Sequence, residues 1–293
     1  MHHRRVKLAD VWIYAFMLVV VLVMLFPFVY VVAVSFTDRD VYVPGQFILI
    51  PEQWSLDAYR YILSSNSFFH SFRSTAFITV AGTLLGLIFS ASFAYGVTKR
   101  ELPGRKFLIL VVLITMLFGA GMIPNYLLIK ELGLIDSLWA LVLPVLTNAW
   151  TIFVMKTFFQ SLPDSLEDAA QIDGCNDLTT WWRIILPLSL PMLAAFSLFF
   201  AVAQWNTYFA GVIYIQDTDK WPLQVLLNQL IIQNQTQVVA DLSSMVIDPN
   251  SARVPQETIK MAALVLVMLP ILAIYPFLQK YFAKGVLLGS VKG

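Results

Sequence analysis

The chain has 293 residues, of which 59% are hydrophobic and 13% are charged, and its formal net charge is +1. Soluble domains carry about one quarter charged residues, so this composition excludes an ordinary soluble protein and indicates an integral membrane protein. The near-zero net charge gives no basic excess that would favour nucleic acid as a partner. The single cysteine, Cys175, excludes an intrachain disulfide and fits a reducing compartment.

Six apolar segments are long enough to cross a bilayer, which takes about 20 helical residues. They cover residues 11–36, 74–98, 107–129, 138–159, 184–212 and 261–280. The expected fold class is therefore all-α, a polytopic membrane protein whose residues 1–293 form a single transmembrane domain. The first segment follows basic residues, as in a signal peptide, but its apolar part exceeds the roughly 7 to 15 residues of a cleavable leader. We expect a retained signal anchor.

Lysine and arginine in short loops set the orientation of a membrane protein, because they remain on the cytoplasmic side. Here they concentrate at the N-terminus, between the second and third spans, and in the C-terminal tail. We therefore expect both termini and the loop of residues 160–183 to be cytoplasmic. Residues 37–73 and 213–257 are then extracytoplasmic segments.

Both extracytoplasmic segments are longer than a connection requires, and each contains one predicted helix. In the first, Ser55 is a favourable N-cap for a helix that ends near residue 63. In the second, residues 224–232 have the pattern of an amphipathic helix lying at the membrane surface, and the amide-rich residues 233–237 are predicted to be a solvated loop. A purely structural role explains the first segment nearly as well as a functional one.

The 160–183 loop and the start of the fifth span carry the most specific pattern in the chain. Its members are Glu167, Asp168, Ala169, Ala170 and Gly174, followed by Ile184, Leu186 and Pro187. Pro163 suits a first helical turn, acidic residues favour the positive end of the helix dipole, and Gly174 favours a helix end. Helical spacing places the two alanines on one side, where they offer a shallow surface to another protein. An ordinary interhelical loop would explain the prolines and the glycine, but not the full spacing.

This pattern resembles the cytoplasmic coupling loop of permease subunits of bacterial ABC importers. In that family, Glu-Ala-Ala is followed after three residues by Gly and, nine residues later, by Ile-x-Leu-Pro. Asp168 stands where the family usually has Glu, a change that keeps the charge and shortens the side chain. Residues 123–128, 132–139 and 279–293 are similar to the MalG-like branch of sugar-importer permeases, and residues 203–206 and 221–224 to permeases for acidic oligosaccharides, including the alginate importer and its oligogalacturonide-type relatives.

The resemblance implies the type I ABC importer fold, with six transmembrane helices, in the bacterial cytoplasmic (inner) membrane. The implied partners are membrane lipid, a sister permease subunit that completes a heterodimer, two ATPase subunits on the cytoplasmic face, and an extracytoplasmic solute-binding protein. The chain lacks the Gly-x-x-x-x-Gly-Lys-Ser/Thr phosphate loop. We therefore expect no enzymatic activity and no cofactor in this chain, with ATP and Mg²⁺ held by the ATPase subunits.

Polar and aromatic residues inside the apolar spans are the candidates for the solute path. They are Asn125, Tyr126, Asn148, Trp150, Gln204, Trp205 and Asn206. Amides in lipid are costly without partners, so these side chains are expected to face the bundle interior, where amides bind sugar hydroxyls and indoles stack on sugar rings. Hydrogen bonding between helices explains residues 204–206 about as well, and the other positions better.

Two other classes of function are less consistent with the sequence. A secondary transporter or channel not driven by ATP usually places charged residues inside its spans, and the six segments here contain such residues only near their ends, at Lys156 and Lys280. An enzyme would need a catalytic or metal site. His70 is the only histidine away from the N-terminus, and no nucleophile or metal cluster accompanies it.

Overall fold

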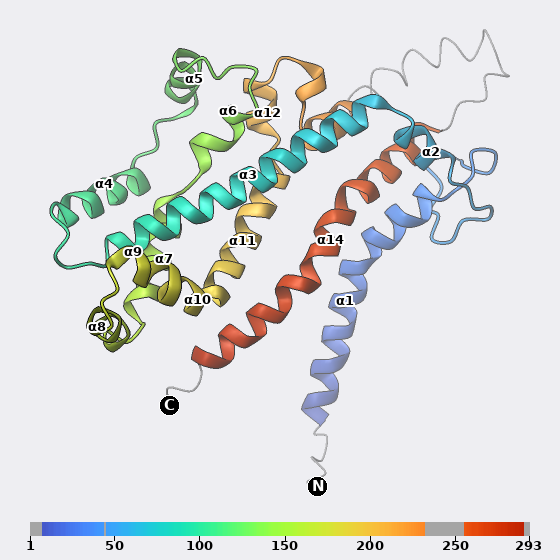
Figure 1. Cartoon of the computed structure of the whole chain (residues 1–293). Helices are drawn as coiled ribbons and strands as arrows, with labels where there is room; N and C mark the ends of the chain where they lie inside the picture. Colours follow the sequence, from blue (N-terminus) through green and yellow to red (C-terminus); the bar gives the residue numbers. More distant parts are fainter. Residues whose placement is uncertain (1–7, 44, 232–254, 290–293) are drawn as a thin grey trace. The chain divides into compact units, whose positions relative to one another are not determined.

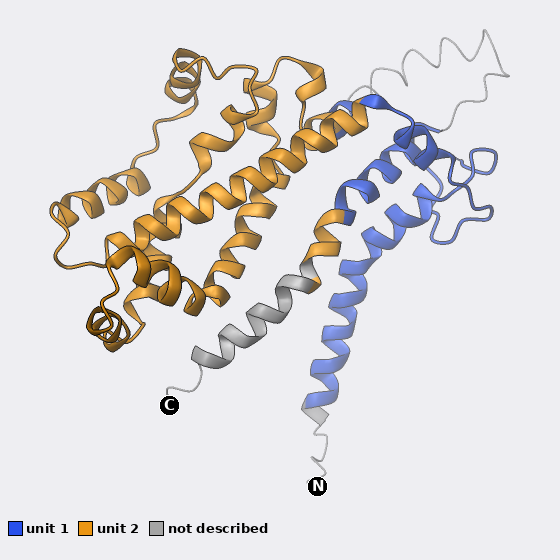
Figure 2. Ribbon diagram, in the orientation of Figure 1, with its two compact units in different colours: residues 1–66, 227–269 blue, residues 67–226, 270–293 orange. Residues whose placement is uncertain are grey.

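The computed structural model describes residues 8–43, 45–231 and 255–289. In these ranges the chain is helical apart from its loops, and the pairing of extended residues is limited to a bridge between Thr37 and Trp54. The expected all-α fold is confirmed. The chain divides into two compact units, residues 1–66 with 227–269 and residues 67–226 with 270–293 (Figure 2).

The first unit contains α1 (Leu8–Ser35), α2 (Asp57–Leu63) and the first part of α14 (Gln256–Gly289) (Figure 1). Most large apolar side chains of α1 are exposed, as expected for a helix surrounded by lipid. The helix predicted after Ser55 is present and begins at Asp57, but its N-cap is Leu56 and not Ser55. The Ser55 hydroxyl, one residue earlier, still accepts a 3.1 Å hydrogen bond from the Asp57 amide.

The second unit is built around α3 (Asn66–Gly96), a helix of 31 residues. The other elements follow in chain order: α4 (Arg105–Leu117), α5 (Met122–Glu131), α6 (Trp139–Val142), the 3-10 turn η1 (Leu143–Val145), α7 (Ala149–Gln160), α8 (Ser165–Ile172), α9 (Asp177–Thr180), the π-helical turn η2 (Trp181–Ile185), α10 (Leu186–Leu188), α11 (Leu190–Trp205), α12 (Phe209–Tyr214) and the 3-10 turn η3 (Thr218–Lys220).

Small residues along α3 allow its neighbours to approach closely. Gly82, Gly86 and Ser90 are spaced four residues apart and therefore lie on one face of the helix. The Gln204 side chain of α11 packs over Gly82, and the Leu146 carbonyl and the Phe200 ring lie over Gly86. The Ser90 hydroxyl donates a 2.7 Å hydrogen bond to the Thr147 hydroxyl. This small-residue face holds α11 and the start of α7 against α3.

Three described helices are long and apolar enough to cross a membrane unbroken: residues Asp10–Ser35, Asn66–Gly96 and Gln256–Ile274. They correspond to the first, second and sixth predicted spans. The second begins eight residues earlier than predicted, so the end of the 37–73 segment forms the first turns of α3.

The other predicted spans are interrupted. The fourth bends by 52° between residues 145 and 149, and the fifth bends by 79° at residue 189. The predicted third span, residues 107–129, is not one helix, because the chain leaves helical geometry between α4 and α5 and Gly121 adopts a left-handed φ of 79°. Each interruption lies near a glycine or proline, the residues that most readily break a helix.

The second predicted extracytoplasmic helix is present at residues 223–231, but its apolar side is not free to lie on a membrane. Leu223 and Val225 are each 1% exposed. The Leu223 amide donates a 2.8 Å hydrogen bond to the Thr75 hydroxyl of α3, and Val225 packs over Gly211 of α12. The start of this helix is therefore part of the protein core. Residues 233–237, predicted as a solvated loop, lie outside the described residues.

Candidate functional site

The 160–183 loop folds around α8, whose two ends follow the expected signals. Glu167 and Asp168 lie in its first turn, where carboxylates favour the helix dipole. Its end is a Schellman motif: Gly174 has a φ of 77°, its amide donates to the Gln171 carbonyl, and the Cys175 amide donates to the Ala170 carbonyl at 2.9 Å. The glycine therefore closes α8 and redirects the chain toward α9.

The second half of the loop leads into the fifth span through α9, η2 and α10. Asn176 caps α9 by accepting a 2.8 Å hydrogen bond from the Thr179 amide. In η2 the Leu186 amide donates to the Trp181 carbonyl, five residues back, and Pro187, which has no amide hydrogen, follows at once. Of the predicted Ile-x-Leu-Pro residues, Ile184 and Leu186 are half-buried and Pro187 is exposed.

Glu167 points toward its own chain and anchors α8 to the end of α3. Its Oε1 accepts a 2.9 Å hydrogen bond from the Tyr95 hydroxyl, and its Oε2 lies 2.5 Å from Lys99 Nζ. The same ammonium lies 3.6 Å from Asp177 at the start of α9. Burial alone would lower the pKa of Lys99, but its hydrogen bonds to Glu167 and Tyr95 outweigh it and raise the pKa above the ordinary lysine value. Lys99 is therefore charged at every physiological pH.

An aromatic cluster lies beneath this ion pair. The Tyr95 and Trp181 rings stack with centroids 4.6 Å apart, and Phe159 of α7 meets Trp181 edge-on at 5.4 Å. Lys99 Nζ lies 4.8 Å from the centroid of the Tyr95 ring, a cation–π distance. Trp181 is only 5% exposed. The base of the loop is therefore packed into the core of the second unit at the ends of α3 and α7.

The surface of α8 differs from the expected one. Ala170 is 2% exposed and packs within the protein, so the expectation that it shares an accessible face with Ala169 is wrong; Ala169 and Asp168 are exposed. The apolar residues that do reach the surface of this region are Ile172, Leu178 and Trp182, which are 85%, 67% and 56% exposed. Apolar side chains exposed on a polar loop are typical of a protein contact surface.

Three of the predicted path residues lie together at the end of α11. Gln204 is 3% exposed, and its buried Oε1 accepts no hydrogen bond from the described part of the chain. Trp205 is 7% exposed and meets Phe72 of α3 edge-on at 6.1 Å. Asn206 is exposed, donates a 2.8 Å hydrogen bond to the Val202 carbonyl and accepts one of 3.2 Å from Gln224.

The remaining path candidates lie on two other elements. Asn148 caps α7 by accepting a 2.9 Å hydrogen bond from the Thr151 amide, which gives its side chain a structural role. Trp150 is half exposed and contacts Phe196 and Phe199 of α11. On α5, Asn125 is exposed and Tyr126 stacks on Tyr214 at 6.3 Å.

Three functional candidates were not identified from the sequence: Lys99, Tyr95 and Gly82. Lys99 is one of the basic residues between the second and third predicted spans, and nothing in its local sequence indicates that it meets a carboxylate 68 residues away. The contact face formed by Gly82, Gly86 and Ser90 could have been predicted from the sequence, because small residues spaced four apart in an apolar helix indicate a close contact between helices.

A second polar cluster lies at the end of the second unit opposite the 160–183 loop (Figure 1). Asp136, with a φ of 61°, accepts hydrogen bonds from the amides of Asp217 and Gln216, at 2.9 and 3.1 Å, and its Oδ2 lies 3.0 Å from Lys220 Nζ. The Asp217 amide bond and then Lys220 lower the pKa of the Asp136 carboxyl. This carboxylate ties the loop before α6 to the loop after α12.

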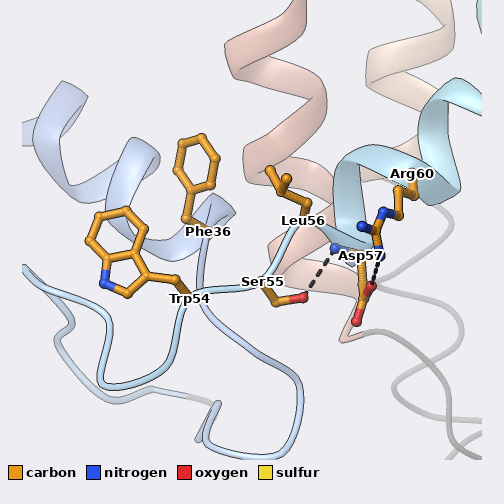
Figure 3. Close-up of a pocket in the computed structure, with 6 residues that line it drawn as sticks. All are labelled: Phe36, Trp54, Ser55, Leu56, Asp57 and Arg60. Carbon is orange, nitrogen blue, oxygen red and sulfur yellow. Dashed lines mark hydrogen bonds and ion pairs between the residues drawn. The ribbon is translucent and has the colours of Figure 1, made fainter.

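The first unit contains a hollow of about 510 Å³ beside α2 (Figure 3). The Phe36 and Trp54 rings line one side of it, and Asp57 and Arg60 line the other. Arg60 lies 3.5 Å from Asp57, and both side chains are largely solvent-accessible. The hollow is thus an open surface feature of the 37–73 segment.

Comparison with known proteins gives the class of this chain. Residues 106–288 match the family of binding-protein-dependent transport system inner membrane components. The chain is 48% identical to the polygalacturonan/rhamnogalacturonan transport system permease protein YtcP of Bacillus subtilis (strain 168), over 98% of this chain and 99% of that protein. It is 46% identical to the protein LplC of the same organism, over 91% of this chain and 89% of that protein.

A solved structure agrees with these relatives. A chain from the crystal structure of a bacterial ABC transporter involved in the import of the acidic polysaccharide alginate superimposes with a TM-score of 0.84 and 31% identity, over 96% of this chain and 99% of that chain. The chain therefore belongs to the family of binding-protein-dependent transport inner membrane components, and is a permease subunit of the ABC importer type. The resemblance seen in the sequence is confirmed.

Proposed function

We propose that this chain is the permease subunit through which an ATP-driven importer carries an acidic oligosaccharide, of the alginate or oligogalacturonide type, across the cytoplasmic membrane. The observation that carries the proposal is the likeness, over nearly the whole chain, to a permease named for polygalacturonan and rhamnogalacturonan and to a transporter of alginate. Both of those proteins are named for polymers rich in uronic acid. A neutral oligosaccharide is the competing substrate class.

In this proposal the 160–183 loop is cytoplasmic, as are both termini, and receives the ATPase subunits. Asp168, Ala169 and the exposed apolar residues Ile172, Leu178 and Trp182 form the contact surface. ATP and Mg²⁺ bind to the two ATPase subunits, a sister permease completes the membrane pair, and a solute-binding protein delivers the sugar to the extracytoplasmic segments. ATP drives transport only if its binding favours one of the two facing states of the permease pair.

The end of α11 is the best-supported part of the solute path. A buried amide oxygen without a partner is costly, so the Gln204 Oε1 requires an explanation. A sugar hydroxyl that donates a hydrogen bond to this oxygen during translocation would supply one. Asn206, exposed two residues later, offers a second amide at the same helix end. Trp205 packs against Phe72, so we assign it to holding this end of α11 in place.

The test is uptake by proteoliposomes that contain this chain, its sister permease, the ATPase and the binding protein. An oligouronate and a neutral oligosaccharide of equal length are compared, with and without ATP. We expect ATP-dependent uptake of the oligouronate and little uptake of the neutral sugar. Preference for the neutral sugar would contradict the acidic substrate class. Uptake that is independent of ATP would instead favour a secondary transporter or channel.

A further inference from the structure

The two carboxylates in the first turn of α8 face different surroundings. Asp168 is exposed, whereas the Glu167 side chain is 29% exposed and both of its oxygens accept hydrogen bonds from the end of α3. Asp168 is thus free to meet another protein, and Glu167 is committed to its own chain. The two adjacent acidic residues of the motif therefore have different roles: Asp168 is available to a partner protein, and Glu167 holds α8 to its own chain.

The ammonium group of Lys99 contacts carboxylates on both helices of the loop, α8 and α9. Lys99 Nζ lies 2.5 Å from Glu167 on α8 and 3.6 Å from Asp177 on α9, and Gly174, with its left-handed φ, lies between these two helices. This bridge adds a side-chain link between α8 and α9 to the turn that contains the glycine. The Lys99 and Glu167 side chains are 24% and 29% exposed, so water weakens their charge-assisted bond less than on an open surface. Asp177 is 79% exposed, so its contact with Lys99 is the weaker of the two.

The anchor reaches the proposed solute path along a single element. Tyr95, which donates to Glu167, is on the last turn of α3, and Gly82, which receives the Gln204 side chain, is on the same helix. A displacement of α8 that moves α3 as a rigid helix must therefore also move the surface on which Gln204 packs. Lys99 lies three residues beyond this helix, in the turn that follows it, so Tyr95 provides the direct contact between α3 and Glu167.

We propose that Lys99 is a positioning residue that fixes α8 and α9 to the end of α3, so that movement imposed on the 160–183 loop by the ATPase is transmitted to α3 and the Gln204 contact. This inference rests on the proposed function of the loop as the ATPase contact. It assigns a role to a residue outside the motif, in the short segment between the second and third predicted spans.

The test uses the reconstituted complex and compares Lys99→Met with Lys106→Met. Both variants remove one positive charge from the same short connection, so any effect on membrane orientation is shared, but Lys106 is exposed on the first turn of α4. We expect Lys99→Met to lower the amount of sugar transported per ATP hydrolysed by about fivefold or more, in the usual range of coupling between sites. Lys106→Met should match the wild type.

Two further variants separate an ion-pair role from simple packing. Glu167→Gln should reproduce most of the Lys99→Met defect, and the double variant should lose less than the sum of the two single defects, because both single variants remove the Lys99–Glu167 ion pair. Lys99→Arg, which keeps the charge, should restore most of the coupling. Co-purification of the ATPase reports whether each complex assembles.

The outcomes distinguish this inference from the proposed function. Failure of the wild-type complex to couple ATP to sugar uptake would contradict the proposed function itself. A wild type that couples, together with a Lys99→Met complex that transports equally well per ATP, would refute the positioning role alone. The same conclusion would follow if Lys99→Arg were as defective as Lys99→Met, or if the defects of the two single variants were additive.

Discussion

The side chain of Gln204 on α11 crosses Gly82 on α3 so closely that a Cβ atom at position 82 would lie 2.5 Å from Gln204 Nε2 and 2.8 Å from its Cγ. At Gly86 an added Cβ would lie 2.8 Å from the Leu146 carbonyl oxygen. Both glycines are thus required by packing, but the obstacle is a side chain at one and the backbone at the other. These contacts set the separation of α3 from its neighbours.

The first prediction compares alanine substitutions along α3. Gly82→Ala and Gly86→Ala should each destabilise the protein, by about 1 to 3 kcal/mol, because overpacking forces the helices apart. Gly86→Ala should destabilise the protein more than Gly82→Ala, because a backbone carbonyl is less free to move than a glutamine side chain. Gly96→Ala is the control, because an added Cβ meets nothing within 4 Å there. Thermal unfolding in detergent measures all three, and equal stability of Gly82→Ala and Gly96→Ala would contradict the packing argument.

A second prediction concerns Gln204 itself. Gln204→Leu removes a buried oxygen that has no partner, so the stability of the protein should be unchanged or higher. Transport should nevertheless fall, with a raised KM for the sugar, if the amide binds substrate hydroxyls. Unfolding temperature and uptake kinetics are measured on the same preparation. A stable variant with normal uptake would place the solute path elsewhere.

The third prediction uses the two alanines of α8. Ala170→Arg should reduce the folded protein recovered from the membrane, because a large charged side chain replaces a methyl group that is 2% exposed. Ala169→Arg should leave folding intact and weaken ATPase binding, since Ala169 is exposed. Folded yield and ATPase co-purification separate the two effects. The reverse pattern, with only Ala170→Arg losing the ATPase, would overturn the assignment of the contact surface.

A fourth prediction tests orientation through the half-buried Cys175. A membrane-impermeant thiol reagent should not label it in intact cells, but should label it in inside-out vesicles. In a Cys175→Ser background, Thr218→Cys should show the opposite pattern, because residue 218 is exposed at the other end of the unit. Labelling of Cys175 from outside would reverse the topology inferred from the lysines and arginines.

The fifth prediction is a pH dependence at Asp136. Because the pKa of Asp136 is lowered in the folded protein, its interactions with the Asp217 amide and with Lys220 stabilise the fold fully at pH values above the ordinary aspartate pKa. This stabilisation is lost as the pH falls through the lowered pKa. Asp136→Asn should therefore speed hydrogen exchange at the Gln216 and Asp217 amides at neutral pH, and the difference from the wild type should shrink in acid. Asparagine also accepts a positive φ, so backbone strain is not introduced. A difference that is independent of pH would exclude the carboxylate as its cause.

The sequence predicted those features that depend on neighbouring residues. The all-α fold follows from long apolar runs, and α8 follows from Pro163 and Gly174, which act on the chain beside them. The breaks in the third, fourth and fifth spans were not predicted, since hydropathy continues through them. The break in the fourth span, for example, occurs where the Leu146 carbonyl meets Gly86, a contact that forms only when the helices pack together.

The location of the candidate site was predicted from the sequence, but the directions of its side chains were not. The motif located the loop, but helical periodicity gives only the relative directions of side chains. It does not say which side meets the rest of the protein. In the structure Ala170 and Glu167 point inward, toward groups on α3 and its following segment, while Asp168 and Ala169 point outward.

Because the motif runs through the π-helical turn at Trp181–Ile185, its spacing fixes a rotation about the helix axis as well as a distance along the chain. One residue more or fewer in a helix rotates everything beyond it by about 100° around the axis. The nine residues between Gly174 and Ile184 therefore set the direction in which the proposed ATPase contact surface of α8 faces, relative to α11 and Gln204. A single-residue insertion here would preserve every side chain named above and still turn that surface away from its proposed partner.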